Sequence, residues 1–269
     1  MINLTTGQFY GQTNKLIQLD GLTLTDTEYT HDWVDWHVHE NAYFTFILEG
    51  SVLEGNKKEI YHCSAGSLLF HNCQEAHYNR KPAGFTRGFH IELESHWLTN
   101  LDLDLSRVEG SLKLVDPQLK GLLYKIFKES KAEDAIQPLA IQSLLVNLLS
   151  RLIGEEPTSH RTLPVWAIQL RDLLQDTPSE NWTLPALAQL VGIHPVHLSR
   201  SFPQYFHCSL SHYIRSLRIQ QSLTLLPHKD RSLTDIALTC GFADQSHFIR
   251  CFKEIYHSKP SAYRALLLR

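Results

Sequence analysis

The 269-residue sequence has no long apolar run and few residues that contain sulfur. No stretch approaches the roughly 18 apolar residues of a membrane-spanning helix, and the opening "MINLTTGQFYGQTNK" lacks the basic head and apolar core of a secretory leader. The five cysteines are odd in number and form no C-x-x-C pair, so neither a disulfide framework nor a zinc ribbon is indicated. We therefore expect a cytoplasmic protein without a membrane anchor, with reduced thiols.

The sequence also lacks an overall excess of positive charge, but its charge is unevenly distributed. Residues 1–165 contain 14 Lys and Arg against 21 Asp and Glu, a net charge of −7. Residues 166–269 contain 11 against 7, a net charge of +4. A basic carboxy-terminal third favours a polyanionic partner for that part alone. The length favours two domains, each with its own core.

Short β-rich segments separated by turns fill the chain from about residue 15 to 95. "YFTFILEGSVLEGNKKEIYHC" predicts two strands around "EGNKK", and "SAGSLLFHN" predicts a turn followed by another strand. This pattern is typical of an all-β sandwich or barrel. Amphipathic helices are predicted next, over 116–131 and 138–153, and the polar "EEPTSHRTLP" over 155–164 predicts a linker.

The second amphipathic helix carries a broad leucine stripe. Its members are Leu144, Leu145, Leu148, Leu149 and Leu152, more than one packing face needs. The stripe could cover the β-domain or form a dimer seam, and heptads this short do not decide between the two.

The last hundred residues contain a degenerate repeat. Residue types from Leu184 to Ile193 recur 49 positions later, and those from Leu198 to Tyr213 recur at an offset of 50. Each copy predicts a helix, a tight turn and a second helix. In the second copy, Ser232 is a predicted N-terminal cap, Gly241 ends the first helix and Asp244 begins the next.

The second helix of the second copy has distinct faces. Phe248, Cys251, Phe252 and Ile255 form its apolar side, which leaves Gln245, Ser246 and Arg250 exposed, where polar groups can reach base edges. Between the copies, residues 209–226 predict one continuous helix about 27 Å long. Successive major grooves on one face of DNA lie roughly 34 Å apart. Such a rod would hold the two exposed helices near one helical turn of separation.

"SLTDIALTCGFADQSHFIRCFKEIYHSKPSAYR" closely resembles the carboxy-terminal signature of AraC/XylS transcription regulators, and "LPALAQLVGIHPVHLSRSFPQYF" is similar to that family's first helix-turn-helix. The resemblance implies an α+β multidomain protein. We expect a cupin-like effector-sensing β-barrel or sandwich over 1–110, trailing helices for dimerisation over 111–154 and a linker over 155–164. Residues 165–269 would form an all-α DNA-binding domain, with two helix-turn-helix motifs joined by a long helix.

The resemblance also implies which side chains face DNA bases. By position these are Val196, Ser199 and Arg200 in the first recognition helix and Gln245, Ser246 and Arg250 in the second. A single surface arginine is more often solvated or salt-bridged, but Arg200 and Arg250 occupy matching positions in the two copies, which favours contact with DNA.

Three residues depart from the family pattern. Pro203 predicts that the first recognition helix bends or ends near Phe202. His207 and His257 stand where glycine is common, so we expect a positive φ with modest strain at both.

The amino-terminal half contains three histidines that resemble the two half-motifs of a cupin barrel. His37 and His39 alternate in "WHVHENAYFTFILEG", and His77 ends "GSLLFHNCQEAH". Metal-binding cupins continue the first motif with a Glu, where this chain has Tyr43 and Phe44. Three imidazoles could bind a divalent ion, but without the carboxylate we favour pocket histidines that donate hydrogen bonds.

We therefore assign no metal and no cofactor. The predicted effector pocket is lined by His37, His39, Tyr43 and His77, with Trp36 and Phe44 nearby, and the first 15 residues form an arm over it.

The resulting hypothesis is a cytoplasmic, homodimeric transcription activator that is not an enzyme. Its partners would be double-stranded DNA in two adjacent major grooves, a small-molecule effector and RNA polymerase. One alternative is a metal-dependent cupin enzyme fused to a DNA-binding domain, which metal analysis would distinguish. Another is a helical protein-interaction module without a DNA role, which the paired recognition helices oppose.

Overall fold

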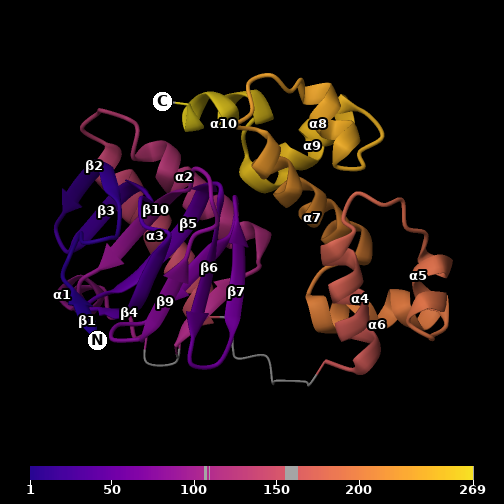
Figure 1. Cartoon of the computed structure of the whole chain (residues 1–269), viewed down its shortest axis with the longest axis horizontal. Helices are drawn as coiled ribbons and strands as arrows, with labels where there is room; N and C mark the ends of the chain where they lie inside the picture. The colour runs from indigo at the N-terminus through magenta and orange to yellow at the C-terminus, as the bar shows by residue number, and fades with distance from the viewer. Residues whose placement is uncertain (106–107, 109, 155–162, 269) are drawn as a thin grey trace. The chain divides into compact units, whose positions relative to one another are not determined.

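The computed structural model describes residues 1–105, 108, 110–154 and 163–268, so most of the predicted linker lies outside the described residues. The chain divides into two compact units, Met1–Gly154 and Glu155–Arg269 (Figure 1). Among the described helices, none has the length and apolar character needed to span a membrane.

The first unit contains two β-sheets and three helices among its described residues. One sheet has the strand order β1-β4-β9-β6-β7 and the other β11-β8-β5-β10-β3-β2. The sheets share no strand, so the architecture is the sandwich of the two predicted alternatives, not the closed barrel. The strands are β1 Ile2–Leu4, β2 Gln12–Leu19, β3 Leu22–Glu28, β4 Trp33–His39, β5 Ala42–Glu49, β6 Ser51–Asn56, β7 Ile60–Ser64, β8 Leu68–His71, β9 His77–Arg80, β10 Arg87–Leu93 and β11 Ser111–Leu114.

The six-stranded sheet has one apolar and one polar face because successive side chains of a strand point to opposite sides. In β5, Phe44 packs on Phe70 of β8 with ring centroids 5.0 Å apart. Tyr43 and Thr45 alternate with Phe44 and so point to the other face. On the apolar face, α2 (Pro117–Glu129) places the Phe127 ring 5.2 Å from that of Phe89 in β10.

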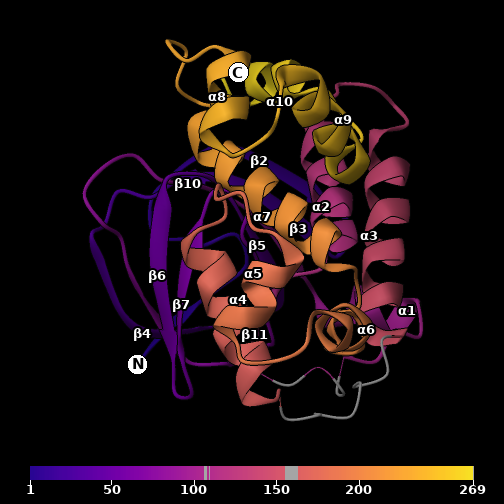
Figure 2. The same ribbon diagram turned by 90° about the vertical axis from the view of Figure 1, so that its right-hand side faces the viewer.

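The leucine stripe lies in α3 (Gln137–Gly154), which packs beside α2 (Figure 2). Leu145, Leu148, Leu149 and Leu152 are buried and Leu144 is half-buried. The buried stripe is consistent with the packing of α3 beside α2, whereas cover of the β-domain and the dimer seam both stay predictions. Leu139, at the start of the same helix, is 70% exposed.

A buried charge cluster links the six-stranded sheet to the end of α2. Arg87 of β10 donates two hydrogen bonds of 2.7 Å to the carboxylate of Asp26 in β3. Lys131, two residues beyond α2, also donates to Asp26. Burial raises the pKa of Asp26, but the hydrogen bonds and charges of Arg87 and Lys131 outweigh it and hold the pKa below its ordinary value.

The prediction of two strands across residues 43–63 was wrong, because three strands occupy that stretch. Gly50, at φ +75°, separates β5 from β6. A Cβ at this position would lie 2.0 Å from the carbonyl oxygen of Phe85, so only glycine fits the turn. The predicted turn at "EGNKK" overlaps the end of β6, and the chain reverses over residues 57–59 before β7.

The first unit also contains the short helix α1 (Ser95–Asn100) besides α2 and α3. Seven helices are described in the second unit. They are α4 Val165–Asp176, α5 Leu184–Leu190, α6 Pro195–Phe206, α7 Leu210–Leu225, α8 Leu233–Thr239, α9 Gln245–Tyr256 and α10 Pro260–Leu267. The predicted helix-turn-helix pairs are α5 with α6 and α8 with α9. Figure 1 shows α7 running between the group α4, α5, α6 and the group α8, α9, α10.

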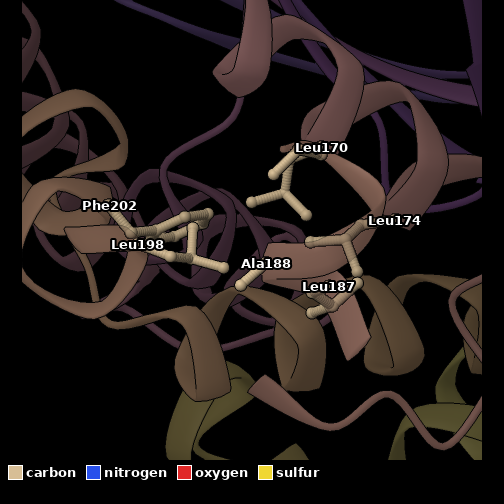
Figure 3. Packing of buried hydrophobic residues seen from close by; sticks show 7 residues of the cluster. Leu170, Leu174, Leu187, Ala188, Leu198 and Phe202 are labelled. Carbon is tan, nitrogen blue, oxygen red and sulfur yellow. The ribbon is translucent and has the colours of Figure 1, made fainter. Parts of the chain in front are cut away.

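Each helix-turn-helix has its own apolar core. Figure 3 shows the first core, where side chains of α4, α5 and α6 converge; the labelled residues are Leu170, Leu174, Leu187, Ala188, Leu198 and Phe202, all fully buried. In the second, Phe252 of α9 lies 5.5 Å from Tyr263 of α10 between ring centroids. Ala188 and Ala237 occupy equivalent buried positions, where a small side chain lets the paired helices approach closely.

The predicted turn chemistry of the second copy is confirmed. The Ser232 hydroxyl accepts a hydrogen bond from the amide of Asp235 at 3.0 Å, and Asp244 accepts one from the amide of His247 at 2.7 Å. Gly241 follows the end of α8 with φ +80°. In the first copy, the ring of His194 serves as the cap, accepting from the Val196 amide at 3.2 Å.

Both expected positive φ angles occur, and of the two alternatives predicted for Pro203 the helix end does not occur. His207 and His257 end α6 and α9 in the left-handed region, at φ +54° and +50°. The expectation of a helix end near Phe202 was wrong, since α6 continues through Pro203 to Phe206. A proline costs the helix one backbone hydrogen bond, and packing of Phe202 and Phe206, stacked at 4.2 Å between centroids, holds the last turn in place.

The predicted rod is continuous. α7 contains 16 residues, which corresponds to about 24 Å. Near its middle, Arg218 donates to the carbonyl oxygens of Pro178 and Glu180 at 3.0 and 2.8 Å and to that of Gly241. The same side chain thus joins the loop before α5 to the turn between α8 and α9.

Candidate functional site

The four predicted pocket residues line one cavity between the two sheets. His37 and His39 come from β4, His77 from β9 and Tyr43 from β5. His37 pairs directly with His77 across the β4–β9 ladder. The sheet register therefore brings together histidines that are 40 residues apart in sequence.

Hydrogen bonds fix the rings of two of the histidines. The Nδ1 atom of His37 lies 2.8 Å from the carbonyl oxygen of Asp35, and that of His77 lies 3.1 Å from the carbonyl oxygen of Glu75. A carbonyl oxygen only accepts, so both Nδ1 atoms carry the proton and both Nε2 atoms are acceptors. The Tyr43 hydroxyl accordingly donates to Nε2 of His77 at 2.9 Å.

Burial sets the charge state of the pocket. It lowers the pKa of His39 to about 2, with the neighbouring His37 adding to the effect, and it lowers the pKa of His37 and His77 as well. It likewise lowers the pKa of His90 to about 3. All four imidazoles are therefore neutral at physiological pH, when they can accept as well as donate hydrogen bonds.

Two buried carboxylates in this region were missed by the sequence analysis. Glu54 of β6 lines the pocket, and its Oε1 lies 3.0 Å from Nε2 of His71. Burial raises the pKa of Glu54, but the charge and hydrogen bond of His71 outweigh it and keep the pKa below its ordinary value. Glu92 of β10 lies 3.9 Å from Nδ1 of His39, and burial raises its pKa to about 7.

The pocket also contains His90 of β10, a strand in which no site residue was predicted. His90 of β10 contacts Thr45 across the β5–β10 ladder, with Nδ1 3.0 Å from the hydroxyl oxygen. Trp36 and Phe44, predicted to lie near the pocket, are next in sequence to the lining residues His37 and Tyr43. Within the described part of the chain, neither lines the pocket: Phe44 faces α2, and Trp36 packs on Tyr78.

The segment between β1 and β2 crosses the pocket, as the predicted arm would. The Phe9 ring stacks on His90 with centroids 3.8 Å apart, and Tyr10 contacts His37 edge-on at 5.4 Å. The amide of Gly7 donates to the carboxylate of Glu92. Residues that an effector would touch thus include part of the amino-terminal segment.

The second candidate surface consists of the outward faces of α6 and α9. Val196, Ser199 and Arg200 are exposed on α6, and Ser246 and Arg250 on α9. Gln245 is half-buried, and its amide oxygen accepts a hydrogen bond of 2.7 Å from the Thr234 hydroxyl of α8. The remaining amide NH₂ group is therefore the end of Gln245 that can approach an acceptor on a base.

Family models match parts of both units. Residues 21–149 match the family model for the AraC-like ligand binding domain, and residues 187–266 match that for a helix-turn-helix domain. The chain belongs to the AraC family of transcription regulators.

Individual relatives share about a third of their residues or fewer with this chain over the aligned parts. An uncharacterized HTH-type transcriptional regulator of Staphylococcus aureus is 28% identical over 152 residues, which are 55% of this chain and 20% of the relative. The chain thus spans only a small part of that relative. The probable transcription factor PqrA of Proteus vulgaris is 34% identical over 86 residues, 32% of this chain and 70% of the relative. The crystal structure of an apo variant of ToxT from Vibrio cholerae shares 14% identity, with 96% of this chain and 100% of that chain covered and a TM-score of 0.41.

Proposed function

We propose that this chain is a sequence-specific DNA-binding transcription regulator that responds to a small-molecule effector. The observation that carries the proposal is the pairing of α6 and α9. Each helix buries an apolar face in a core of its own and exposes an arginine at the matching position, Arg200 in one and Arg250 in the other. Each also exposes a serine, Ser199 or Ser246, at positions that do not correspond in the repeat. The basic charge of this part of the chain suits a phosphate backbone.

The base-reading roles of these residues are part of the proposal. An arginine in a major groove can bind the O6 and N7 atoms of guanine together, which contributes about 1–3 kcal/mol of discrimination. Val196, 49% exposed, presents an apolar surface suited to a thymine methyl group. Each recognition helix would read its own half-site.

The pocket of the first unit is the proposed effector site, with no catalytic step assigned to it. Neutral histidines, Tyr43 and the aromatic rings of Phe9 and Tyr10 suit a small molecule with polar groups and an apolar part. The effector would act by population shift, binding one conformation of the regulator more tightly than another. Contacts between the effector and residues 5–11 would be one way for the effector to favour one conformation.

We further propose that the regulator is a cytoplasmic homodimer that activates transcription together with RNA polymerase. Exposed apolar side chains around the trailing helices support the dimer, since Val115, Ile136 and Leu139 are 71%, 68% and 70% exposed. A shared interface would bury them. Light scattering on the purified chain tests this part: Leu139→Glu should yield monomers, and an unchanged mass would contradict the proposed seam.

Selection of bound sites from random DNA by the full-length protein tests the proposal as a whole. We expect two short boxes about one helical turn, roughly 34 Å, apart. The enriched pool should contain the same two boxes in independent selections. Binding without sequence preference would contradict the proposed function. A thermal-shift screen of metabolites, compared between the wild type and His37→Ala, addresses the effector: stabilisation of the wild type alone supports the pocket.

A further inference from the structure

The side chains of the three pocket histidines, His37, His39 and His77, converge on one point. One potential ligand atom from each of His37, His39 and His77 lies within 4.8 Å of the others. The ring centroids of His37 and His77 are 4.1 Å apart, and all three side chains are buried. The β4–β9 register places His37 opposite His77, and His39 follows on the same face of β4, so that three imidazoles meet at one point of the pocket.

The orientation of the rings matches that of metal-ligating histidines. Such histidines almost always donate the other ring N–H to a backbone carbonyl, a carboxylate or water, which fixes the metal-binding nitrogen. His37 and His77 each bond their Nδ1 to a carbonyl oxygen two residues earlier, so that Nε2 is the nitrogen that can bind a metal. Nε2 of His77 accepts a hydrogen bond from the Tyr43 hydroxyl, which a metal ion would displace. His39 has a carboxylate on its Nδ1 side, with Glu92 at 3.9 Å.

The region also contains negative charge that would compensate a cation. Glu54 is buried and lines the same pocket, and its Oε2 atom receives a hydrogen bond of 3.3 Å from Asn79. Oε1 of Glu92 and Nδ1 of His39 are both buried without a hydrogen-bond partner among the described residues. An inward movement of about 1 Å would join these two atoms at hydrogen-bond distance.

From this geometry we propose that His37, His39 and His77 bind one divalent transition-metal ion of the Zn²⁺ class. Imidazole nitrogen suits Zn²⁺, Fe²⁺ and Ni²⁺, and three protein ligands leave a coordination position open. Around tetrahedral Zn²⁺ the donor atoms lie roughly 3.3 Å apart, which small side-chain rotations would achieve from the described positions.

The inference rests on the proposed function in one respect, since it places the ion inside the effector pocket. An oxygen donor of the effector, such as a carboxylate, would take the open position. Tyr43 lies beside it, because its hydroxyl now contacts Nε2 of His77 at 2.9 Å. When the ion takes that nitrogen, the hydroxyl is released to donate to the effector oxygen.

Zn²⁺ titration of the chelator-treated full-length protein tests the site. Calorimetry on the wild type should give one ion per chain, and saturating Zn²⁺ should raise the midpoint of thermal unfolding. His37→Gln and His77→Gln should each weaken binding by more than about 100-fold, the upper end of what loss of an outer-shell partner costs. His90→Gln, which changes a buried histidine of the same pocket outside the trio, should bind Zn²⁺ like the wild type.

X-ray absorption of the Zn²⁺-loaded wild type gives a test that does not depend on the folding of any variant. We expect only nitrogen and oxygen neighbours, at about 2.0–2.1 Å, with imidazole scattering. Sulfur neighbours at about 2.3 Å would assign the ion to cysteines and overturn the site. Less than one ion per chain, or equal affinity in His37→Gln and His90→Gln, would overturn it as well. DNA selection by the same preparations separates the two proposals: retained box selection without Zn²⁺ binding removes only the metal site.

Discussion

Arg218 in α7 donates a hydrogen bond to the carbonyl oxygen of Gly241, the glycine of the turn between α8 and α9. Its other guanidinium bonds reach Pro178 and Glu180, in the loop that precedes α5. One side chain on the connecting helix therefore contacts both halves of the second unit. Its position makes Arg218 a determinant of how the two recognition helices are spaced.

Arg218→Lys should keep the positive charge but lose the planar fork that reaches three carbonyl oxygens. We expect the free energy of unfolding to fall by about 1–3 kcal/mol, the cost of leaving polar groups unsatisfied, and the preference for one box spacing to weaken. Urea unfolding and gel-shift assays on sites with lengthened or shortened spacing measure the two effects. An unchanged spacing preference would show that α7 alone sets the distance.

Gly241 and Gly192 form a matched pair at equivalent turns of the two motifs. Both have positive φ, +80° and +69°. A Cβ on Gly241 would lie 2.3 Å from the carbonyl oxygen of Ser179, whereas none of the described atoms lies within 4 Å of a Cβ on Gly192. Gly192→Ala should cost about 1–2 kcal/mol for the left-handed conformation alone, and Gly241→Ala clearly more. Equal losses in chemical denaturation would refute the close approach at Ser179.

The buried Asp26 carboxylate makes the first unit sensitive to acid. Its pKa in the folded state lies below its ordinary value, so the unfolded chain takes up a proton first as the pH falls. The stabilisation is complete above the pKa of the unfolded state, near 4, and is lost as the pH falls through the lower pKa of the folded state. Unfolding free energies measured between neutral and acidic pH should therefore decline below about pH 4.

Asp26→Asn should remove that part of the pH dependence and destabilise the protein at neutral pH by about 3–5 kcal/mol, because Arg87 and Lys131 both lose the buried carboxylate that accepts their hydrogen bonds. The matched control is Asp32→Asn, whose carboxylate is 82% exposed beside Lys81 and should have little effect. If both variants retained the same acid sensitivity as the wild type, Asp26 would not be its source.

Local sequence chemistry was sufficient to predict most of the second unit. Ser232, Gly241 and Asp244 specify where helices begin and end through contacts within a few residues, and the repeat supplies the same information twice. Their positions in the structure follow those predictions. The helix does not end near Phe202, one of the two alternatives predicted for Pro203, since α6 continues to Phe206. The contact of the Phe202 and Phe206 rings on either side of the proline lies outside the local pattern.

The pocket could be predicted only in part, since it depends on strand pairing. His37, His39 and His77 stood out as unusual residues in apolar strands. Glu54 and His90 join them only because β6 pairs with β9 and β10 with β5, pairings that a single sequence does not specify. Tyr43 points into the pocket and Phe44 points to the apolar face of the six-stranded sheet, and these directions likewise follow from the register of β5.

The central claim is that α6 and α9 each read one half of a bipartite DNA site, and selection with two single variants tests it most directly. Arg200→Ala should relax base preference in one box and Arg250→Ala in the other, each by about 1–3 kcal/mol at the affected position, while the untouched box stays as in the wild type. If both variants weakened binding uniformly across sequences, or altered the same box, the two helices would not read separate half-sites and the claim would be wrong.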